Sequence, residues 1–228
     1  MFTHAILRTP CPELIHGITT ASLGTPDYTK ALAQHEAYAD ILEACGLNLR
    51  ILDADSRYPD SVFIEDVALC TPNCAVITRP GALSRRGETL SIEPELRDYY
   101  QHVEYIYATG TLDAGDVMMV GSHYYIGLSE RTNAAGAAQL IAILERYGLS
   151  GETVPLKTML HLKTGVSYLE NNTLLVYGEF VQHPAFSSFQ RIEIDANEAY
   201  AANSLWVNDR VLVPEGHPKT AKKIADAG

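Results

Sequence analysis

The sequence has little positive charge and no long apolar run, and each shortage excludes a class of protein. Its 17 Lys and Arg residues stand against 28 Asp and Glu residues, which gives a formal net charge of −11. Nucleic-acid binding depends on clustered basic side chains, so no nucleic-acid partner is expected. No window approaches the roughly 18 uninterrupted apolar residues of a membrane span. The N-terminus also lacks a basic leader followed by apolar residues, so secretion and membrane insertion are both unsupported.

Cysteine is scarce as well, and its placement argues against a metal site. The four cysteines are Cys11, Cys45, Cys70 and Cys74. No second close pair of ligands joins Cys70 and Cys74 to complete a tetrahedral zinc site. Neither a GxGxxG nor a P-loop pattern occurs. We therefore expect free thiols in a cytoplasmic protein, with no metal and no organic cofactor.

What is present is the composition of an ordinary globular protein. Apolar residues make up 46% of the 228 residues, charged residues 20%, and the mean hydropathy is −0.04. Such a chain can bury a substantial core, and we expect one domain over residues 1–228. Its acidic balance suits a small cationic ligand better than an anionic one.

The main organisational feature is a β-hairpin that recurs at intervals of about 50 residues. In each copy, two short runs of strand-forming residues flank a turn rich in Asn, Asp, Gly or Pro. The hairpins are predicted at 66–78, 116–127, 166–177 and 204–213. The recurrence predicts a chain built from similar modules.

Helices and single strands fill the intervals between the hairpins. Apolar spacing predicts a helix over 27–45, and Thr132 is expected to cap a second helix that ends near Gly148. Pro94 and Pro218 are expected at the first turns of helices that reach Tyr99 and Ala227. Further strands are predicted at 5–8, 47–52, 102–107, 152–156 and 191–194. This alternation predicts an α/β ring of modules around a central axis.

Charged and titratable residues gather where the hairpins begin. Consecutive acids at the start of an apolar strand are costly unless a cation or hydrogen-bond donors meet them. Two carboxylates can grip the planar fork of a guanidinium. Strand-entry caps are the structural alternative for any one acid. The residues are Asp60, Glu65 and Asp66 at the first hairpin, Asp113 and Asp116 at the second, and His161 at the third.

His161 has the residue type needed for a general acid and base near neutral pH, with Asp113 expected to orient its ring. Arg85 and Arg131 are candidates to bind a substrate carboxylate. Arg86 is expected to be a solvated surface residue.

Five motifs, in order, resemble those of dimethylarginine dimethylaminohydrolase, with the bacterial members most similar. They are Phe63-Ile64-Glu65-Asp66, Ser84-Arg85-Arg86-Gly87-Glu88, Leu112-Asp113-Ala114-Gly115-Asp116-Val117, Gly127-Leu128-Ser129-Glu130-Arg131-Thr132-Asn133 and Leu160-His161-Leu162-Lys163. The resemblance covers essentially the whole chain. It implies the fold of the guanidino-group-modifying superfamily, a five-bladed, pseudo-symmetric α/β propeller of ββαβ modules.

The resemblance also implies roles for particular residues. Asp66 would bind the guanidinium nitrogens with Glu65 beside it, and Asp60 would receive the substrate α-amino group. Arg85 and Arg131 would hold the carboxylate.

The same family pattern covers the catalytic groups and the closing loop. His161 matches the catalytic histidine, and Asp113 its acidic partner, where bacterial relatives often carry Glu. Ile18 lies in a loop that would close over the substrate, where the family usually has Leu.

The implied reaction is the hydrolysis of N-methylated arginine to citrulline and a methylamine through a cysteine-bound thiouronium. The family places that cysteine near the C-terminus, after one more strand, and none of the four cysteines matches its place. We therefore expect the last blade to be incomplete in this sequence, and the 228 residues alone to be inactive.

Two rival classes stay open at this level. Arginine deiminases and amidinotransferases share the chemistry, although the former usually carry an extra helical domain and the latter are longer. A non-catalytic propeller that binds a guanidino ligand or a protein is the second alternative. Some family members are homodimers, so a homodimer is also among the expected assemblies.

Overall fold

The computed structural model describes residues 1–20 and 24–228, and within them the strands form five small sheets. Three sheets have three strands: β3 (Ala68–Cys70), β4 (Ala75–Ile77) and β5 (Val103–Tyr105); β6 (Val117–Val120), β7 (His123–Leu128) and β8 (Ser150–Pro155); β9 (Val166–Tyr168), β10 (Thr173–Val176) and β11 (Gln190–Glu193). Two have two strands: β1 (His4–Arg8) with β2 (Asn48–Leu52), and β12 (Leu205–Val207) with β13 (Arg210–Leu212). All four predicted hairpins are confirmed.

Each three-stranded sheet follows the same plan. An antiparallel hairpin supplies the first two strands, and the third strand returns parallel to the second. Three of the four hairpin turns, those after β6, β9 and β12, use left-handed backbone, which Asn and Gly accept most readily. Asn171, Asn172, Asn208 and Gly121 all have positive φ in these turns. Local turn chemistry therefore fixes the repeat that the sequence shows.

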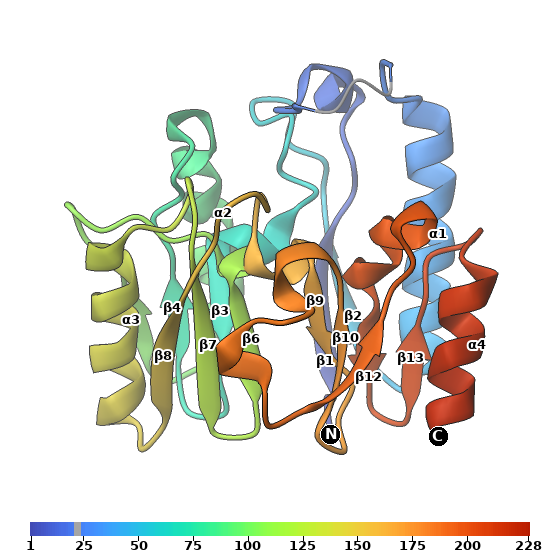
Figure 1. Ribbon diagram of the computed structural model, residues 1–228. Coiled ribbons are helices and arrows are strands. Elements are labelled where there is room, and N and C mark those ends of the chain that lie inside the picture. The colour runs from blue at the N-terminus through green and yellow to red at the C-terminus, as the bar shows by residue number, and fades with distance from the viewer. Residues whose placement is uncertain (21–23) are drawn as a thin grey trace.

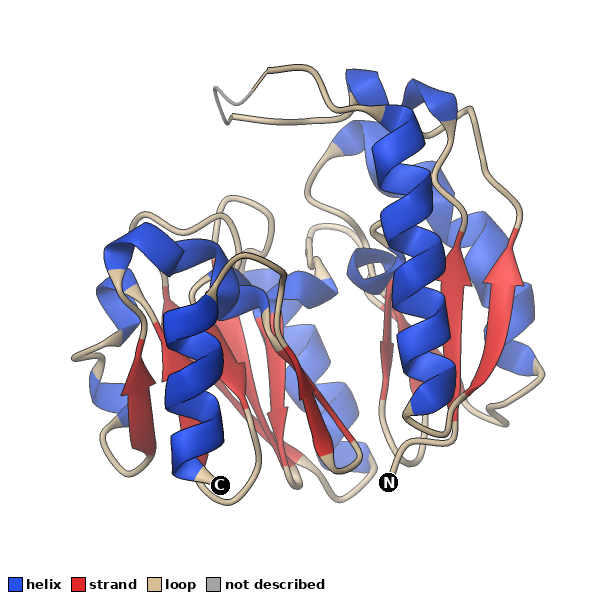
Figure 2. Cartoon of the chain, turned by 90° about the vertical axis from the view of Figure 1, so that its right-hand side faces the viewer, coloured by secondary structure: helices blue, strands red, loops and turns tan. Residues whose placement is uncertain are grey.

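Four helices pack on the outside of the sheets, as Figures 1 and 2 show: α1 (Tyr28–Ala44), α2 (Thr89–Arg97), α3 (Ala134–Arg146) and α4 (Pro218–Ala227). In Figure 1, α3 lies at one side of the molecule, and α1 and α4 lie at the other. Leu140 and Leu144 of α3 are fully buried against β7 and β8. Each contributes about 1.5–3 kcal/mol by burial.

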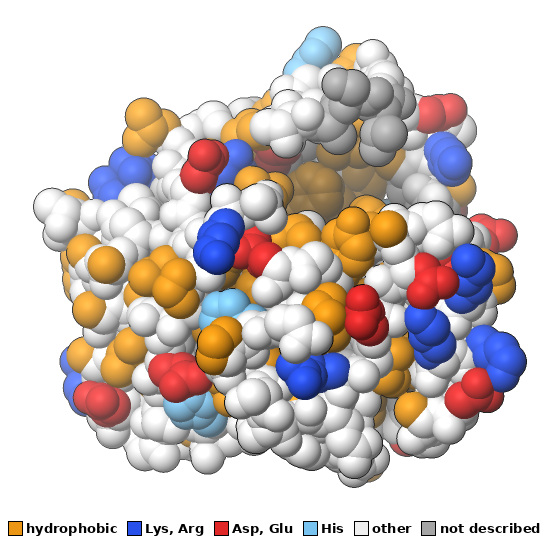
Figure 3. All heavy atoms as spheres, viewed as in Figure 1, with side chains coloured by type: hydrophobic (Ala, Val, Ile, Leu, Met, Phe, Trp, Pro, Cys, Tyr) orange, Lys and Arg blue, Asp and Glu red, His pale blue; other side chains and the backbone are white. Residues whose placement is uncertain are grey.

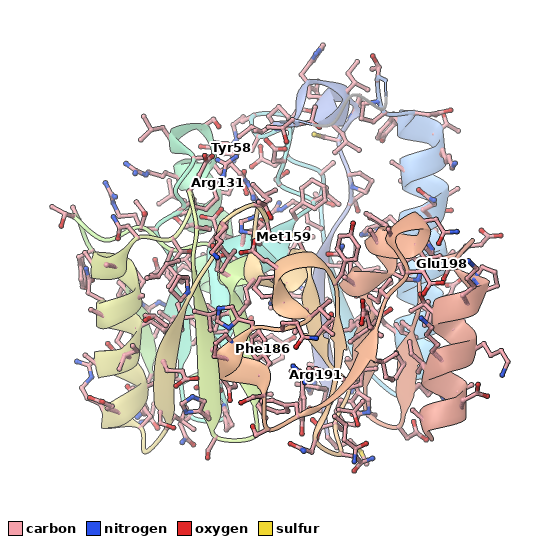
Figure 4. All side chains as sticks on the ribbon, in the orientation of Figure 1. Tyr58, Arg131, Met159, Phe186, Arg191 and Glu198 are labelled. Carbon is pink, nitrogen blue, oxygen red and sulfur yellow. The ribbon has the colours of Figure 1, made fainter. Side chains whose placement is uncertain are left out.

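Two helix starts differ from prediction. Asn133, not Thr132, caps α3, because its side chain accepts a hydrogen bond from the N–H of Gly136 at 2.8 Å. The Thr132 hydroxyl instead donates to a buried carboxylate of Asp116. Pro94 lies inside α2 rather than at its first turn, because a short 3-10 helix at Leu83–Glu88 leads directly into that helix. Pro218 does begin α4. The backbone N–H groups of Lys219 and Thr220, in the first turn of that helix, donate hydrogen bonds to the carboxylate of Glu198 (Figure 4).

The first and fifth sheets meet and close the ring. The side chain of Asn208 accepts from the N–H of Phe2 at 2.7 Å and donates to the carbonyl of Cys45 at 2.9 Å. The rings of Phe2 and Trp206 pack edge to face. Five adjacent modules confirm the predicted α/β propeller. Among the described residues, the fifth module has only its hairpin and helix α4, so its sheet has two strands, like that of β1 and β2, where the other three sheets have three.

All four cysteines are free thiols. In the described part of the chain, no helix combines the length and apolar character needed to cross a membrane.

Candidate active site

Short 3-10 turns at the entrances of three inner strands bring the predicted acids and histidine together. They are η2 (Ile64–Val67) before β3, η4 (Ala114–Asp116) before β6 and η5 (Leu162–Thr164) before β9. The turn η4 contacts both η2 and η5. Asp66, Asp113 and His161 consequently offer side-chain atoms that all lie within 4.8 Å of one another. The repeat thus converts three distant segments into one cluster.

Close backbone approach explains the glycine at the centre of this cluster. The N–H of Gly115 donates to Oδ1 of Asp66 at 3.0 Å. A Cβ at Gly115 would lie 2.6 Å from that oxygen and 3.2 Å from the His161 ring. Only glycine leaves room for the carboxylate and the imidazole side by side.

Asp113 is the most perturbed carboxyl group of the cluster. Its side chain is buried, and Oδ1 accepts a hydrogen bond from the N–H of Gly81 at 2.8 Å. Burial raises the pKa of Asp113 to about 6, and the nearby charge of Asp66 acts in the same direction, against that hydrogen bond. Asp113 is therefore ready to ionise when a cation arrives, because a positive charge lowers the pKa of a neighbouring carboxyl.

The ring of His161 is flanked by carboxylates. Nδ1 lies 3.3 Å from Oδ2 of Asp116, and Nε2 lies 4.0 Å from Oδ1 of Asp66. Burial alone would lower the pKa of His161, but Asp116, Asp66 and Asp113 together outweigh it and raise that pKa above its ordinary value. The expectation that Asp113 orients the ring needs correction, because the carboxylate nearest to Nδ1 belongs to Asp116.

The two predicted carboxylate-binding arginines are placed differently. The Arg85 guanidinium is buried and engaged, with Nη1 2.5 Å from Asp66 and Nη2 2.8 Å from Glu88. In this structure it supports Asp66, which corrects the expectation of a guanidinium open to a substrate carboxylate. The Arg131 side chain makes no hydrogen bond or ion pair within residues 1–20 and 24–228, and it lies at the same end of the molecule as Met159, in the segment before His161 (Figure 4).

Asp60 and Ile18, which were expected to have separate roles in substrate binding, contact each other. Oδ1 of the buried Asp60 accepts a hydrogen bond from the backbone N–H of Ile18 at 2.9 Å. The Ile18 side chain itself is 46% exposed. Glu65 departs from expectation, because it is exposed and its Oε1 lies 2.6 Å from the Lys163 ammonium. Glu65 therefore sits at the rim of the cluster rather than beside Asp66 inside it.

Figure 3 shows a recess in the upper part of the face that it draws, with apolar side chains on its inner wall. The atoms of Asp66, Asp113 and His161 are close enough to one another to surround a metal ion. Their negative charge and partly apolar surroundings equally suit a planar organic cation.

Three supporting residues, Asp116, Glu88 and Ser129, lie inside the motifs quoted above, but their contacts were not predicted. Asp116 is fully buried and Glu88 nearly so. Asp116 was expected among the acids at the second hairpin, and Glu88 is the one acid of its motif. Their partners depend on how the fold brings the motifs together.

The four cysteines make their contacts away from His161. Cys45 and Cys74 belong to the hydrophobic clusters around α1 and α3, and Cys11 contacts the carbonyl of Tyr58. Cys70 is the last residue of β3 and pairs with Ala75 next to the hairpin turn, whereas η2 with Asp66 precedes the first residue of that strand. Burial raises the pKa values of Cys11 and Cys74, which disfavours their thiolates.

Comparison with known proteins gives relatives over the whole chain. The chain is 57% identical over 229 residues to the N(G),N(G)-dimethylarginine dimethylaminohydrolase of Pseudomonas aeruginosa, covering 100% of this chain and 90% of the relative. It is 38% identical to the protein of the same name in Streptomyces coelicolor, covering 98% and 86%. The Pseudomonas enzyme, solved as a cysteine-to-serine variant with citrulline, superposes with a TM-score of 0.99 and the same coverage as in the sequence comparison.

The same fold recurs at 19% identity and a TM-score of 0.81 in the N-terminal domain of a cyanobacterial arginine dihydrolase, covering 98% of this chain and 88% of that domain. A family model described as "N,N dimethylarginine dimethylhydrolase, eukaryotic" matches residues 26–212. The chain belongs to the dimethylarginine dimethylaminohydrolase family.

Proposed function

We propose that this protein hydrolyses N-methylated arginine to citrulline and a methylamine. The observation that carries the proposal is a half-buried histidine between carboxylates. The Arg131 guanidinium, which pairs with no described side chain, lies at the same end of the molecule as Met159, in the segment before that histidine. The printed names of the relatives and the citrulline bound to the Pseudomonas enzyme support it.

Substrate binding uses charge at both ends of the amino acid. Asp66 and Asp113 receive the guanidinium, whose positive charge offsets the cost of two buried carboxylates. Arg131 binds the substrate carboxylate. Asp60 accepts from the α-ammonium group while it also holds the backbone of Ile18.

The chemistry proceeds in two balanced steps. A thiolate attacks the guanidinium carbon, the bond from that carbon to the methylated nitrogen breaks, and His161 gives its proton to the departing amine. The thiouronium that results keeps the arginine backbone. His161 then takes one proton from water, whose oxygen bonds to the same carbon. Citrulline leaves as the carbon–sulfur bond breaks and the thiolate returns, and the second proton of that water is released to solvent.

The nucleophile has to come from outside the four cysteines of this sequence. Cys45 and Cys74 lie in hydrophobic clusters, and Cys11 faces a backbone carbonyl. We propose that another segment of the protein presents the thiol to the guanidinium carbon. The cysteine-to-serine variant used to capture citrulline in the Pseudomonas relative supports a thiol in that role.

The proposal extends to the cellular location and the oligomeric state of the protein. We propose a cytoplasmic enzyme, because free thiols suit a reducing compartment. A homodimer is proposed as its assembly, with residues 1–228 acting as one domain in each subunit.

The test is citrulline release from asymmetric dimethylarginine, with arginine as the comparison substrate. It is run on the 228-residue chain and on the protein produced from the whole gene. Release by the whole-gene product from the dimethylated substrate alone supports the proposal. Release from arginine at an equal rate favours a deiminase, and release from neither substrate refutes the proposed activity. Release by the 228 residues themselves would refute the external thiol.

A further inference from the structure

Asp116 is a buried carboxylate that the proposed chemistry leaves without a role. It has no exposed surface, and its two oxygens contact two different parts of the site. Oδ1 accepts a hydrogen bond from the N–H of Leu162 at 2.9 Å. Oδ2 accepts from the hydroxyls of Ser129 at 2.6 Å and Thr132 at 2.7 Å, and it lies 3.3 Å from Nδ1 of His161. A fully buried carboxylate with this many hydrogen-bond partners holds those partner groups in defined positions.

The first set of contacts holds the turn that carries Arg131. The Ser129 hydroxyl donates to Asp116 and accepts from the backbone N–H groups of Arg131 at 3.0 Å and Thr132 at 3.1 Å. The backbone N–H of Ser129 in turn donates to the carbonyl of Thr132. One serine hydroxyl therefore links the Asp116 carboxylate to the backbone of Arg131.

The second set of contacts holds the catalytic ring. Leu162 follows His161 directly, so its N–H bond to Asp116 fixes the backbone next to the ring. Nδ1 of His161 is buried and makes no hydrogen bond of normal geometry with any described residue, yet it faces the Asp116 carboxylate at 3.3 Å. A proton on Nδ1 is favoured by that carboxylate, which leaves Nε2 to exchange protons on the Asp66 side.

We propose that Asp116 is a positioning residue that fixes His161 and Arg131 relative to each other. The proposal rests on the proposed function, in which His161 moves protons and Arg131 holds the substrate carboxylate. Asp113 makes a different set of contacts: its carboxylate accepts from the N–H of Gly81 and lies within 4.8 Å of the Asp66 and His161 side-chain atoms. A single carboxylate then controls both turnover and substrate affinity.

The experiment separates the two arms with two variants of the whole-gene product. Asp116→Asn removes the charge from both arms, and Ser129→Ala breaks only the link to Arg131. Ser129→Thr restores the hydroxyl. Ser150→Ala is the matched control, since the exposed Ser150 hydroxyl contacts the His123 ring at the point where β7 and β8 begin. The kcat and KM for asymmetric dimethylarginine and the ¹⁵N shifts of the His161 ring are measured for each.

For Asp116→Asn we expect kcat to fall about 100-fold, as small misplacements of catalytic groups do. KM should rise together with it, and the His161 ring should lose its fixed Nδ1–H tautomer and titrate at lower pH. Asp116, Asp66 and Asp113 are the titratable groups that face this ring, and the last two are unchanged. For Ser129→Ala we expect KM to rise about tenfold, consistent with one lost hydrogen bond to a charged group, with kcat and the tautomer retained. Ser129→Thr should restore KM.

The tautomer decides the proposal independently of turnover. In the unmodified protein, a neutral His161 ring protonated on Nε2 instead of Nδ1 overturns it, even if Asp116→Asn does not fold. An unchanged tautomer and titration in folded Asp116→Asn also overturns it, as does an unchanged KM in Ser129→Ala. If the unmodified protein releases no citrulline, the proposed function fails while the ring measurement still decides the role of Asp116.

Discussion

Nδ1 of His161 faces Oδ2 of Asp116 at 3.3 Å, and Nε2 on the opposite side of the ring faces Oδ1 of Asp66 at 4.0 Å. Carboxylates on both sides stabilise the imidazolium. A bound guanidinium neutralises the carboxylate on the Asp66 side, which weakens the hold on the proton as the substrate arrives. The ring is thus acidic enough to protonate a leaving amine only when there is a substrate to cleave.

Replacing His161 by Ala should abolish turnover in the whole-gene product while substrate still binds. General acid–base groups typically contribute about 10²–10⁴-fold to rate, and no other described side chain takes the same place. Turnover is measured by citrulline release and binding by calorimetry with asymmetric dimethylarginine. Unchanged turnover would refute the role given to His161.

Replacing Asp113 by Asn should stabilise the fold above pH 6. The pKa of Asp113 is raised to about 6 from 3.8, so its favourable contribution is complete below pH 3.8 and is lost as pH rises through 6. A shift of about 2 pKa units corresponds to at most about 3 kcal/mol. Urea unfolding at pH 8 should give a higher free energy of unfolding for Asp113→Asn than for the parent protein. At pH 3.5 this difference should be absent.

The control for that variant is Asp40→Asn on the exposed side of α1, which should change stability by less than about 0.5 kcal/mol at either pH. Affinity for the substrate should fall in Asp113→Asn, because the guanidinium loses one carboxylate. Equal stability of Asp113→Asn and the parent at pH 8 contradicts the raised pKa.

Replacing Arg131 by Ala should raise KM by about 10–100-fold with little change in kcat. The loss corresponds to about 1.5–3 kcal/mol for hydrogen bonds to a charged group. Arg146→Ala is the control, since that arginine pairs with Glu104 and its side chain is 58% exposed. Steady-state kinetics give the KM of each variant. Equal increases in KM for Arg131→Ala and Arg146→Ala would show that the overall charge of the protein, and not the position of Arg131, determines binding.

Replacing Glu88 by Gln should destabilise the protein by about 3–5 kcal/mol, because the buried Arg85 loses a charged partner. Glu93→Gln breaks an exposed pair with Arg97 and should cost at most about 0.5 kcal/mol. Thermal unfolding of the two variants makes the comparison. A cost below 1 kcal/mol for Glu88→Gln would show that Arg85 finds another partner and that its contact with Asp66 is not held in place.

Replacing Gly17 by Ala should weaken substrate binding without unfolding the protein. A Cβ there would lie 2.7 Å from Oδ1 of Asp60, so the carboxylate must move and release the N–H of Ile18. We expect KM to rise about tenfold, consistent with one lost charge-assisted bond. Thr20→Ala, at an exposed position in the same loop, is the control. Identical KM values for the two variants would exclude the Asp60 contact as part of the binding site.

The repeat and most elements were predictable from sequence because they depend on local signals. Turn residues such as Asn171 and Asn208 mark the hairpins, and the predicted returning strands differ from the observed ones by only a few residues at their ends. The motifs likewise identified His161, Asp66 and Asp113 as one site. Local rules could not distinguish neighbours within a motif. Thr132 and Asn133 are both good helix caps, and only the tertiary position of Asp116 determines that Thr132 serves that carboxylate instead.

The same limit applies to charge pairing. Arginines at 85 and 131 look equivalent in sequence, but Arg85 is buried beside Glu88 and Asp66, whereas Arg131 is not. Which arginine is already paired depends on contacts between residues 19 positions apart and on the packing of η2 against its neighbours. A sequence pattern predicts the chemistry of a cluster more readily than the pairing within it.

The bond between Phe2 and Asn208 has a consequence for how the molecule is made. The two partners are 206 positions apart, so this contact cannot form until the chain up to Asn208 has left the ribosome. At about 5–20 residues per second, β1 and β2 wait roughly 10–40 s for their neighbours in the fifth module. During translation the first module has an open flank, and a chaperone or a second nascent chain can reach it before the ring closes.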